Sequence, residues 1–233
     1  MRKQHSVWEE EHKKINVLPS MASDKPNSGV VLFVKYLKTK IKPQVRCIDI
    51  GCGKGRNAIY LAQQGFEVYG IDYVKSSIEH AKKAASNNDV SSRLILTKAF
   101  MDRKWPFKDN FFDVAIDCFA SIDVETKKGR ETYKKEMLRT LKPGGYVLVM
   151  AVAAEDEIES ELIRTSPGKE RNSTIWPGGK FQKDYDENEL REFYDEFEIM
   201  KVRKIKKPAF KLNRNYTATN YWMVLRKSAK SKI

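Results

Sequence analysis

Hydrophobic residues in the middle of the chain gather in short runs, and the segments between the runs carry apolar residues at helical spacing. Short apolar runs are typical of buried parallel strands, whereas the wider spacing is typical of helices. The runs predict strands at Val45–Ile50, Phe66–Ile71, Leu94–Leu96, Phe112–Asp117 and Tyr146–Val152. The intervening segments predict helices at Gly29–Lys40, Arg56–Gln64, Ser76–Asn87 and Thr126–Leu141.

Two capping boxes add starting points for helices. Ser6 and Glu9 have the spacing of a capping box and predict a short charged helix through Lys14. Ser76 and Glu79 have the same spacing, so we expect the helix that ends near Asn87 to begin there. The stretch 16–28 contains two prolines and small polar residues, which predicts a loop.

The chain changes character after the fifth strand. Residues 153–183 contain recurring prolines and glycines, so we expect irregular chain there. Asp186 and Glu189 form a further capping box, which predicts a helix with an apolar face. Two last runs, at 198–206 and 218–227, predict an antiparallel pair of strands that completes the sheet.

Strands that alternate with helices predict an α/β fold with helices on both faces of the sheet. We expect a doubly wound, Rossmann-like, mostly parallel seven-stranded sheet with an antiparallel last strand, formed by one domain over 1–233. Ligands on such sheets bind at the carboxyl ends of the strands. The expected parts are an N-terminal helical lid, a ligand-binding core, a cap over the substrate, and a C-terminal helix with strands, at 1–43, 44–152, 153–185 and 186–233.

The composition indicates the cellular compartment that we expect for the protein. No apolar stretch approaches the about 18 residues of a membrane span, and the first residues lack the apolar core of a secretory signal. The three cysteines, Cys47, Cys52 and Cys118, are scattered and odd in number, which suggests a reducing compartment. We therefore expect a cytoplasmic protein without a membrane partner. The sequence indicates no metal site, and it does not indicate an oligomeric state.

The net charge of +13 is concentrated near the end of the chain, because residues 199–233 contain eleven Lys or Arg and no Asp or Glu. One interpretation is a surface for nucleic acid or for an anionic substrate. The other is that these charges protect an edge strand from pairing with other molecules and belong to a solvated tail.

A glycine-rich loop follows the first predicted strand. Its glycines are Gly51, Gly53 and Gly55, and they allow the backbone to turn sharply and to approach a ligand closely. A dinucleotide site requires Gly-x-Gly-x-x-Gly, but Arg56 stands where that motif has its third glycine. Asp72 ends the second predicted strand and has the chemistry to accept both hydroxyls of a ribose. A nucleoside without a pyrophosphate fits this combination, whereas a ligand-free tight turn would leave the acid unexplained.

Four motifs resemble the signature set of the class I S-adenosylmethionine (SAM) dependent methyltransferases, namely Asp49–Gly55, Asp72, Phe112–Val114 and Leu141–Gly145. The resemblance implies that SAM is the cofactor and S-adenosylhomocysteine the product. It also implies that Asp49 lies near the methionine end and that Asp72 holds the ribose. The cofactor-binding residues that it implies are Asp49, Gly51, Cys52, Gly53, Gly55, Asn57, Asp72, Tyr73, Asp102 and Asp117.

A narrower resemblance concerns the acceptor. The segments Gly55–Ala62 and Gly65–Val68, together with Lys180-Phe181 and the later Tyr194, resemble tellurite-resistance-type small-molecule methyltransferases. One position departs from the superfamily pattern. The acid expected after the third strand, for the adenine amino group, falls on Met101, and Asp102 comes one residue later. Either the loop shifts and Asp102 binds adenine, or a backbone N–H does so.

In this fold the loop after the fourth strand faces the transferred methyl group. It contains the candidate catalytic residues Asp117, Cys118 and Phe119. The Asn/Asp-Pro-Pro-Tyr/Phe motif of amino-directed DNA methyltransferases is absent, and Cys118 lacks the preceding proline of cytosine-C5 enzymes. Asp117 has two interpretations, as a group that steers acceptor or sulfonium, or as the acceptor of a structural hydrogen bond. For Cys118 the interpretation as a buried thiol at the end of a strand competes with a catalytic one.

Candidate acceptor-binding residues come from the N-terminal helix, the cap and the basic segment, and they are Trp8, His12, Arg164, Trp176, Lys180 and Arg214. Each has a structural alternative: packing for the tryptophans, solvation for His12, and a hairpin turn for the segment around Arg214. The sequence thus favours transfer of methyl from SAM to a small molecule by in-line displacement. An RNA methyltransferase that uses the basic segment and a non-catalytic SAM-binding protein stay open as alternatives. A general base is needed only if the acceptor must lose a proton.

Overall fold

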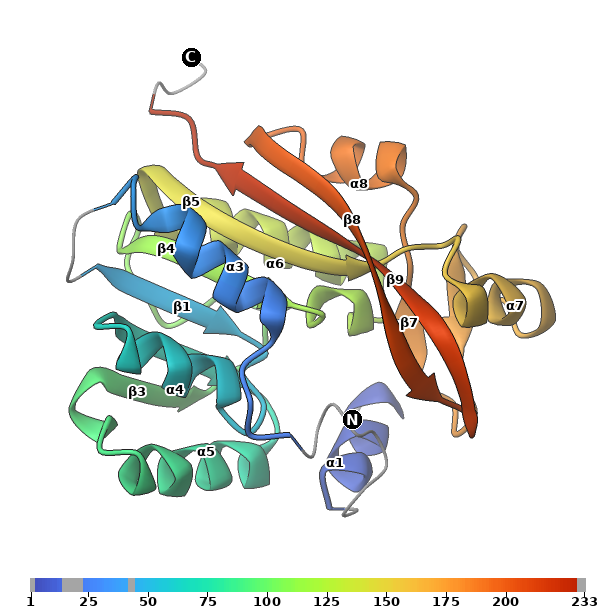
Figure 1. The fold of residues 1–233 in the computed structure, drawn as a ribbon, viewed down its shortest axis with the longest axis horizontal. Coiled ribbons are helices and arrows are strands. Elements are labelled where there is room, and N and C mark those ends of the chain that lie inside the picture. The colour runs from blue at the N-terminus through green and yellow to red at the C-terminus, as the bar shows by residue number, and fades with distance from the viewer. Residues whose placement is uncertain (1–2, 14–22, 42–44, 230–233) are drawn as a thin grey trace.

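A mixed sheet of seven strands, in the order β3-β2-β1-β4-β5-β9-β8, forms the centre of the molecule (Figure 1). The computed structural model describes residues 3–13, 23–41 and 45–229. Strands β1 to β5 run parallel, β9 is antiparallel to β5, and β8 is antiparallel to β9. The strands are β1 Arg46–Ile50, β2 Glu67–Asp72, β3 Leu94–Lys98, β4 Phe112–Cys118, β5 Leu141–Val152, β8 Glu198–Lys211 and β9 Arg214–Arg226. The expected doubly wound sheet with an antiparallel last strand is confirmed.

Helices cover both faces of the sheet. Side chains of α3, α4 and α5 belong to one buried cluster, and side chains of α6 and α8 belong to the cluster on the opposite face. The helices are α1 Lys3–Lys13, α3 Ser28–Leu37, α4 Arg56–Gln63, α5 Lys75–Asn87, α6 Lys127–Thr140, α7 Glu157–Thr165 and α8 Glu187–Phe193. None of the helices in the described ranges is long and apolar enough to cross a bilayer.

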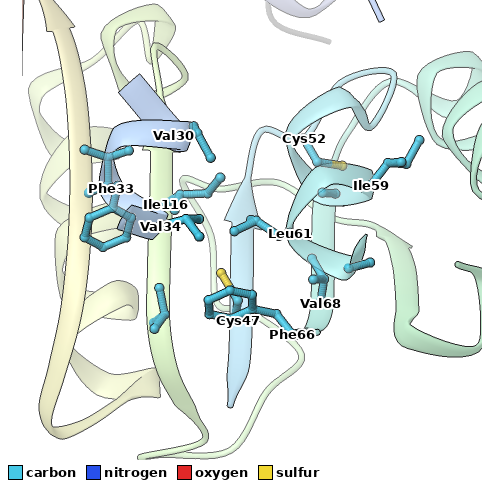
Figure 2. Close-up of a cluster of buried hydrophobic side chains, with 14 of the residues drawn as sticks. Val30, Phe33, Val34, Cys47, Cys52, Ile59, Leu61, Phe66, Val68 and Ile116 are labelled. Carbon is cyan, nitrogen blue, oxygen red and sulfur yellow. The ribbon is translucent and has the colours of Figure 1, made fainter. Parts of the chain in front are cut away.

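Successive side chains of a strand point to opposite faces of the sheet, so a single strand contributes to both buried clusters. Within β5, Val147 points into the cluster with α6, and the next residue, Leu148, points into the cluster with α3. Figure 2 shows the second of these, where Phe33 and Val34 of α3 lie over Ile116 of β4. Burying one such side chain stabilises the fold by about 1.5–3 kcal/mol, so the two clusters fix the strand ends that carry the site.

The segment between β5 and β8 is more regular than its composition predicts. The expectation of irregular chain at 153–183 is wrong for α7, which begins after Asp156, and for a separate two-stranded sheet of β6 Ser173–Ile175 and β7 Phe181–Lys183. The Asp156 carboxylate accepts hydrogen bonds from the N–H groups of Ile158 and Glu159 and caps the helix. Ile158 and Leu162 lie four residues apart on one face of α7, but the helix is only nine residues long, which is short for a clear helical pattern in a sequence.

Several element boundaries differ from the prediction. Helix α5 begins at Lys75 without a side-chain cap, so Ser76 lies inside the helix and does not cap it. Helix α1 begins at Lys3, before the expected Ser6. Strand β5 begins at Leu141, because that residue already pairs with Phe112. The predicted cap Asp186 of α8 is confirmed, since it accepts a backbone N–H of its helix. Thr126, expected as the first residue of α6, caps that helix instead. The division into lid, core, cap and C-terminal part stays a prediction.

Strands β8 and β9 form a long hairpin. Leu212 and Asn213 form its turn with φ values of 50° and 58°, which is typical of a two-residue hairpin loop. The basic stretch around Arg214 therefore contains a hairpin turn, as one of its two interpretations proposed. Strand β8 lies at the edge of the sheet and alternates exposed with half-buried positions. Figure 1 shows the hairpin reaching past the other strands toward α7 and β7.

Candidate functional site

A cavity of about 1300 Å³ lies at the carboxyl ends of the parallel strands. Its walls come from the loops after β1, β2, β3 and β4, from α1, from β7 and from the β8–β9 hairpin. Single small-molecule sites usually measure about 300–1,000 Å³. The cavity is therefore large enough for a cofactor with a second molecule beside it.

The glycine loop after β1 forms one end of this cavity. Gly51 and Gly53 have positive φ values of 67° and 52°, and both line the cavity. A Cβ atom on Gly53 would meet no atom within 4 Å, so this glycine borders open space. A Cβ atom on Gly51 would lie 2.5 Å from the Cβ of Ala120 and 3.1 Å from Cε of Met101. Gly51 thus permits the loops after β3 and β4 to approach the glycine loop.

Gly55 has a different role from the one expected. It precedes α4 with a φ of 88° and does not belong to the cavity wall. An added Cβ atom would lie 2.9 Å from the Cβ of Ala81, a residue of α5. The absence of a side chain at Gly55 therefore allows α4 to pack against α5, and the cavity wall gives no support to its assignment to the cofactor.

Asp72 lies at the end of β2 and lines the cavity. One carboxylate oxygen accepts the N–H of Gly53 at 2.9 Å, and the other accepts the N–H of Val74 at 2.8 Å. Burial raises the pKa of this carboxyl group, and the same two N–H groups oppose the rise. The next residue, Tyr73, stacks on Phe100 with ring centroids 5.5 Å apart. An acid and an aromatic pair thus stand together next to the glycine loop.

Of three other residues expected to bind the cofactor, two line the cavity and one lies outside its wall. Cys52 lines the cavity, and its backbone N–H donates to the carbonyl of Ile71 at 3.0 Å. Asn57 also lines the cavity, and its side-chain oxygen accepts the N–H of Asn27 at 2.9 Å. Asp49 is 1% exposed and lies outside the cavity wall. Burial raises its pKa to about 8, so this carboxyl group is protonated in a large share of molecules at neutral pH.

Met101 and Asp102 both line the cavity. The Trp105 indole N–H donates to the Met101 carbonyl at 2.9 Å and fixes this loop. The Met101 side chain lies beside Gly51, whereas Asp102 lies beside the start of α6, with its Cβ 3.3 Å from where a Cβ of Gly129 would stand. The two residues therefore border different parts of the cavity.

The three candidate catalytic residues at the end of β4 differ in whether they line the cavity. Asp117 is fully buried and outside the cavity wall, and its carboxylate accepts the Tyr133 hydroxyl at 2.7 Å and the Ala120 N–H at 2.8 Å. Its structural interpretation is therefore favoured over the one as a cofactor or catalytic residue. Cys118 and Phe119 do line the cavity. Burial raises the pKa of the Cys118 thiol to about 12, so it is protonated at neutral pH.

Two of the candidate acceptor-binding residues meet in the cavity wall. Lys180 and Trp8 both line it, and the Lys180 Nζ lies 4.7 Å from the centre of the Trp8 ring system. Trp176 lies behind them, with its ring 5.0 Å from the same Nζ. Residues 176–180 and the N-terminal helix thus lie together beside one part of the cavity.

Two further candidates, Arg164 and Arg214, lie outside the cavity wall. Arg164 is exposed on α7 and outside the cavity wall. Arg214 forms an ion pair with Glu161 at 2.6 Å, also away from the cavity. His12 belongs to α1, but its side chain lies outside the described part of the chain. Arg164 and Arg214 thus do not border this cavity, so the structure gives no support to their assignment to the acceptor.

Sequence reasoning missed residues that reach the wall through tertiary contacts. Gln4 of α1 donates to the carbonyls of Asp123 and Phe181 and accepts the N–H of Phe181 at 2.9 Å. It thereby fixes α1 to β7 across 177 residues of sequence. No local pattern marks such a glutamine. Gln182 and the hairpin residues 207–210 of the wall were missed for the same reason.

The sequence and the fold of this protein are similar to those of known proteins. Residues 47–145 match a methyltransferase domain family, and this range includes the glycine loop and Asp72. This part of the chain therefore carries a methyltransferase domain. The methyltransferase domain from Methanosarcina mazei has the same fold, with a TM-score of 0.73 and 22% identity over 84% of this chain and 98% of that chain. The class I fold and the SAM-dependent class are thereby confirmed.

Curated relatives of the methyltransferase domain differ in their named activities. The protein is 27% identical to the methyltransferase YqeM of Bacillus subtilis, over 78% of this chain and 80% of the relative. It is 24% identical to the SAM-dependent methyltransferase TehB of Haemophilus influenzae, over 71% of this chain and 50% of the relative. A sterol 4-C-methyltransferase of Caenorhabditis elegans is 28% identical over 53% of this chain. The chain spans only 36% of that sterol enzyme and half of TehB.

Proposed function

We propose that this protein transfers the methyl group of SAM to a small-molecule acceptor by in-line displacement. The observation that carries the proposal is the single cavity that extends from Gly53 and Asp72 to Trp8 and Lys180. Its far walls are supplied by α1, β7 and the β8–β9 hairpin of the same chain, so an acceptor inside it is surrounded on several sides. Relatives named for action on a small molecule, such as the sterol enzyme, agree with this proposal.

The residues at the glycine loop fit the cofactor. Gly53 offers a wall without a side chain, and Asp72 offers a carboxylate already oriented by two backbone N–H groups. We assign the ribose hydroxyls to Asp72, and the adenine ring to the region of Met101 with its amino group toward Asp102. Bound SAM supplies a methyl group that its sulfonium already activates. The chain's own contribution is then to orient the acceptor and to exclude water.

The side chains near the end of β4 narrow the chemistry of the acceptor. The Asp117 carboxylate is engaged by a hydroxyl and by backbone N–H groups, and the Cys118 thiol is protonated at neutral pH. Neither is available as a general base. We therefore propose an acceptor atom that is nucleophilic without the help of these residues, such as a thiolate, an amine or an oxyanion.

The RNA alternative has less support from the basic hairpin. Its cations form ion pairs with acids of the same chain, namely Lys204 with Glu155, Lys211 with Glu159, Arg214 with Glu161 and Arg226 with Glu198. Three further lysines, Lys201, Lys206 and Lys207, lie on the edge strand β8, which agrees with protection of the edge. A gel shift with RNA at low salt tests this alternative, because phosphate contacts give a steep salt dependence.

Calorimetric titration with S-adenosylhomocysteine and an acceptor screen with methyl-labelled SAM test the proposal. Binding heat together with labelled product from a small molecule is the expected result. Absence of binding heat refutes the assignment of the cavity to SAM. Tight binding without labelled product from any small-molecule class favours the non-catalytic alternative.

A further inference from the structure

Lys180 is a buried cation in the wall of the acceptor half of the cavity. The residue is 5% exposed, and it follows the turn at Gly178 and Gly179 that leads into β7. Its carbonyl accepts the N–H of Trp176 at 2.7 Å, which closes the turn and fixes the backbone of Lys180. The position of this amine is therefore set by the fold before any ligand arrives.

The immediate neighbours of the Lys180 Nζ are aromatic faces. The ring of Trp8 lies 4.7 Å away and the ring of Trp176 lies 5.0 Å away. Such faces attract a cation, and the attraction increases when water is excluded. However, an ammonium group has three N–H donors, and the face of a ring does not replace an oxygen acceptor for all of them. Two indoles thus hold the charge in place and leave it able to bind an anion.

Other cations in the same part of the molecule have carboxylate partners. Lys183, which is three residues further along, pairs with Glu189 at 2.7 Å. Lys211 also lies over Trp176 and also lines the cavity, yet it pairs with Glu159 at 2.5 Å. Within the described part of the chain, no carboxylate lies within 4.0 Å of Lys180. A buried charge without such a partner is costly, and a ligand that supplies the negative charge offsets that cost.

We propose that Lys180 binds an anionic group of the methyl acceptor, a carboxylate or an equivalent oxyanion, and that Trp8 packs against the apolar body of the same molecule. This inference rests on the proposed function, because it identifies the second molecule in the cavity as the acceptor. Lys180 is then a specificity-determining residue, which selects acceptors by charge and takes no part in the transfer itself.

Benzoate and benzamide form a matched pair of probes, because they share a ring and differ in charge. Trp8 and Trp176 flank the site, so the intrinsic tryptophan fluorescence of the protein saturated with S-adenosylhomocysteine reports its occupation. We expect saturable binding of benzoate and binding of benzamide at least about tenfold weaker, the loss expected for one charge-assisted hydrogen bond. Equal affinities for the two probes, or no saturable binding of benzoate, overturn the proposal.

A pair of variants assigns the effect to one cation. Lys180→Met keeps an unbranched apolar side chain and removes the charge, and we expect it to weaken benzoate binding about tenfold or more. Lys206→Met is the matched control, because Lys206 is exposed on the β8–β9 hairpin and lies outside the cavity wall. We expect the control to leave benzoate affinity within about twofold, as is usual for exposed charges. Equal losses in both variants contradict a specific role of Lys180.

Two further measurements separate this proposal from neighbouring ones. Lys180→Arg keeps the positive charge. If benzoate still binds to Lys180→Arg but not to Lys180→Met, the loss is due to the missing charge and not to altered packing of α1. Titration with S-adenosylhomocysteine tests the proposed function independently. If that titration shows no heat while benzoate still binds through Lys180, the methyltransferase proposal fails and the anion site stands. If S-adenosylhomocysteine binds and benzoate does not, the anion site fails alone.

Discussion

The carboxylate of Asp72 accepts a hydrogen bond from the backbone N–H of Gly53 at 2.9 Å. This bond joins the end of β2 to the loop after β1, so the acid assigned to the ribose and the loop assigned to the rest of the cofactor form one unit. The second oxygen is held by the N–H of Val74 at 2.8 Å. Both oxygens are thereby oriented before the cofactor binds, which lowers the conformational cost of binding.

Asp72→Ala is expected to weaken binding of S-adenosylhomocysteine by about 1.5–3 kcal/mol, the range for hydrogen bonds to a charged group. The variant also leaves the N–H groups of Gly53 and Val74 without their acceptor, so we expect a lower midpoint of thermal unfolding in the absence of ligand. Isothermal titration calorimetry measures the first effect. Asp195→Ala is a suitable control, because this acid is exposed and pairs with Lys134 on α6. Unchanged affinity in Asp72→Ala would rule out the ribose assignment.

Gly53→Ala tests whether the glycine loop contacts the ligand. An alanine at positive φ costs about 1–2 kcal/mol of stability, but a Cβ atom here would meet no protein atom, so the fold tolerates it. We expect at least a tenfold loss of affinity for S-adenosylhomocysteine, about 1.4 kcal/mol, because the methyl group enters the space of the ligand. Gly53→Val is expected to abolish the binding heat.

Gly65→Ala is the matched control for that experiment. Gly65 has a positive φ of 94°, and its added Cβ atom would likewise meet no atom within 4 Å, but it follows α4 outside the cavity wall. Both alanine variants carry the strain of a positive φ, and the strain is larger at Gly65, whose φ lies beyond the left-handed region. A loss of affinity common to both would show that strain, and not contact with the ligand, is responsible.

The grouping of the residues assigned to the cofactor was predictable from the sequence because these residues are close together in the chain. Gly51, Gly53 and Asp72 follow successive strands of a parallel sheet, and the ends of neighbouring strands meet. The same local reasoning placed Gly55 at the ligand, where the structure gives it to helix packing against Ala81. A glycine pattern shows where the backbone turns, but it does not show which neighbour requires the absent side chain.

The acceptor half was only partly predictable, because its walls come from segments far apart in the chain. Lys180 and Trp8 were named as candidates, yet no spacing indicates that they meet. Gln4, which fixes α1 to β7, was missed altogether. Charge alone was misleading for Arg214, since it does not show that Glu161 neutralises this cation. Tertiary partners decide these roles, and no local pattern encodes them.

Cys118 is expected to be unreactive in the folded protein. Burial raises the pKa of its thiol from an ordinary value near 9 to about 12, so its thiolate fraction at pH 8 falls by about three orders of magnitude. Alkylation with iodoacetamide at pH 8, followed by mass spectrometry, is expected to label Cys118 slowly in the native protein and rapidly in urea. Cys118→Ala is expected to retain methyl transfer. Rapid native labelling, or loss of transfer in that variant, would restore Cys118 as a candidate catalytic residue.

Asp184 and Glu159 form a buried acidic pair behind the cavity wall. Asp184 is fully buried, one of its carboxylate oxygens accepts the Gln182 amide at 2.6 Å, and the other has no hydrogen-bond partner among the described residues. Burial, and next the negative charge of Glu159, raises the pKa of Asp184 well above its ordinary value. The folded state thus favours the protonated acid.

Asp184→Asn is therefore expected to stabilise the protein as the pH rises. Because the folded-state pKa is raised, the stability that the protonated acid contributes is fully present below the ordinary pKa of about 3.9 and is lost as pH increases toward the raised value. Asparagine keeps an oxygen for Gln182 and does not ionise, so the variant avoids this loss. The unfolding midpoint of Asp184→Asn relative to the unmodified protein should rise between pH 4.5 and pH 8. Asp186→Asn is a control with the opposite effect on stability. The Glu189 N–H and next Arg171 lower the pKa of Asp186, so its ionised carboxylate stabilises the folded protein at neutral pH, and the substitution removes that stabilisation. A difference for Asp184→Asn that does not vary with pH would show that Asp184 is not held protonated by the fold.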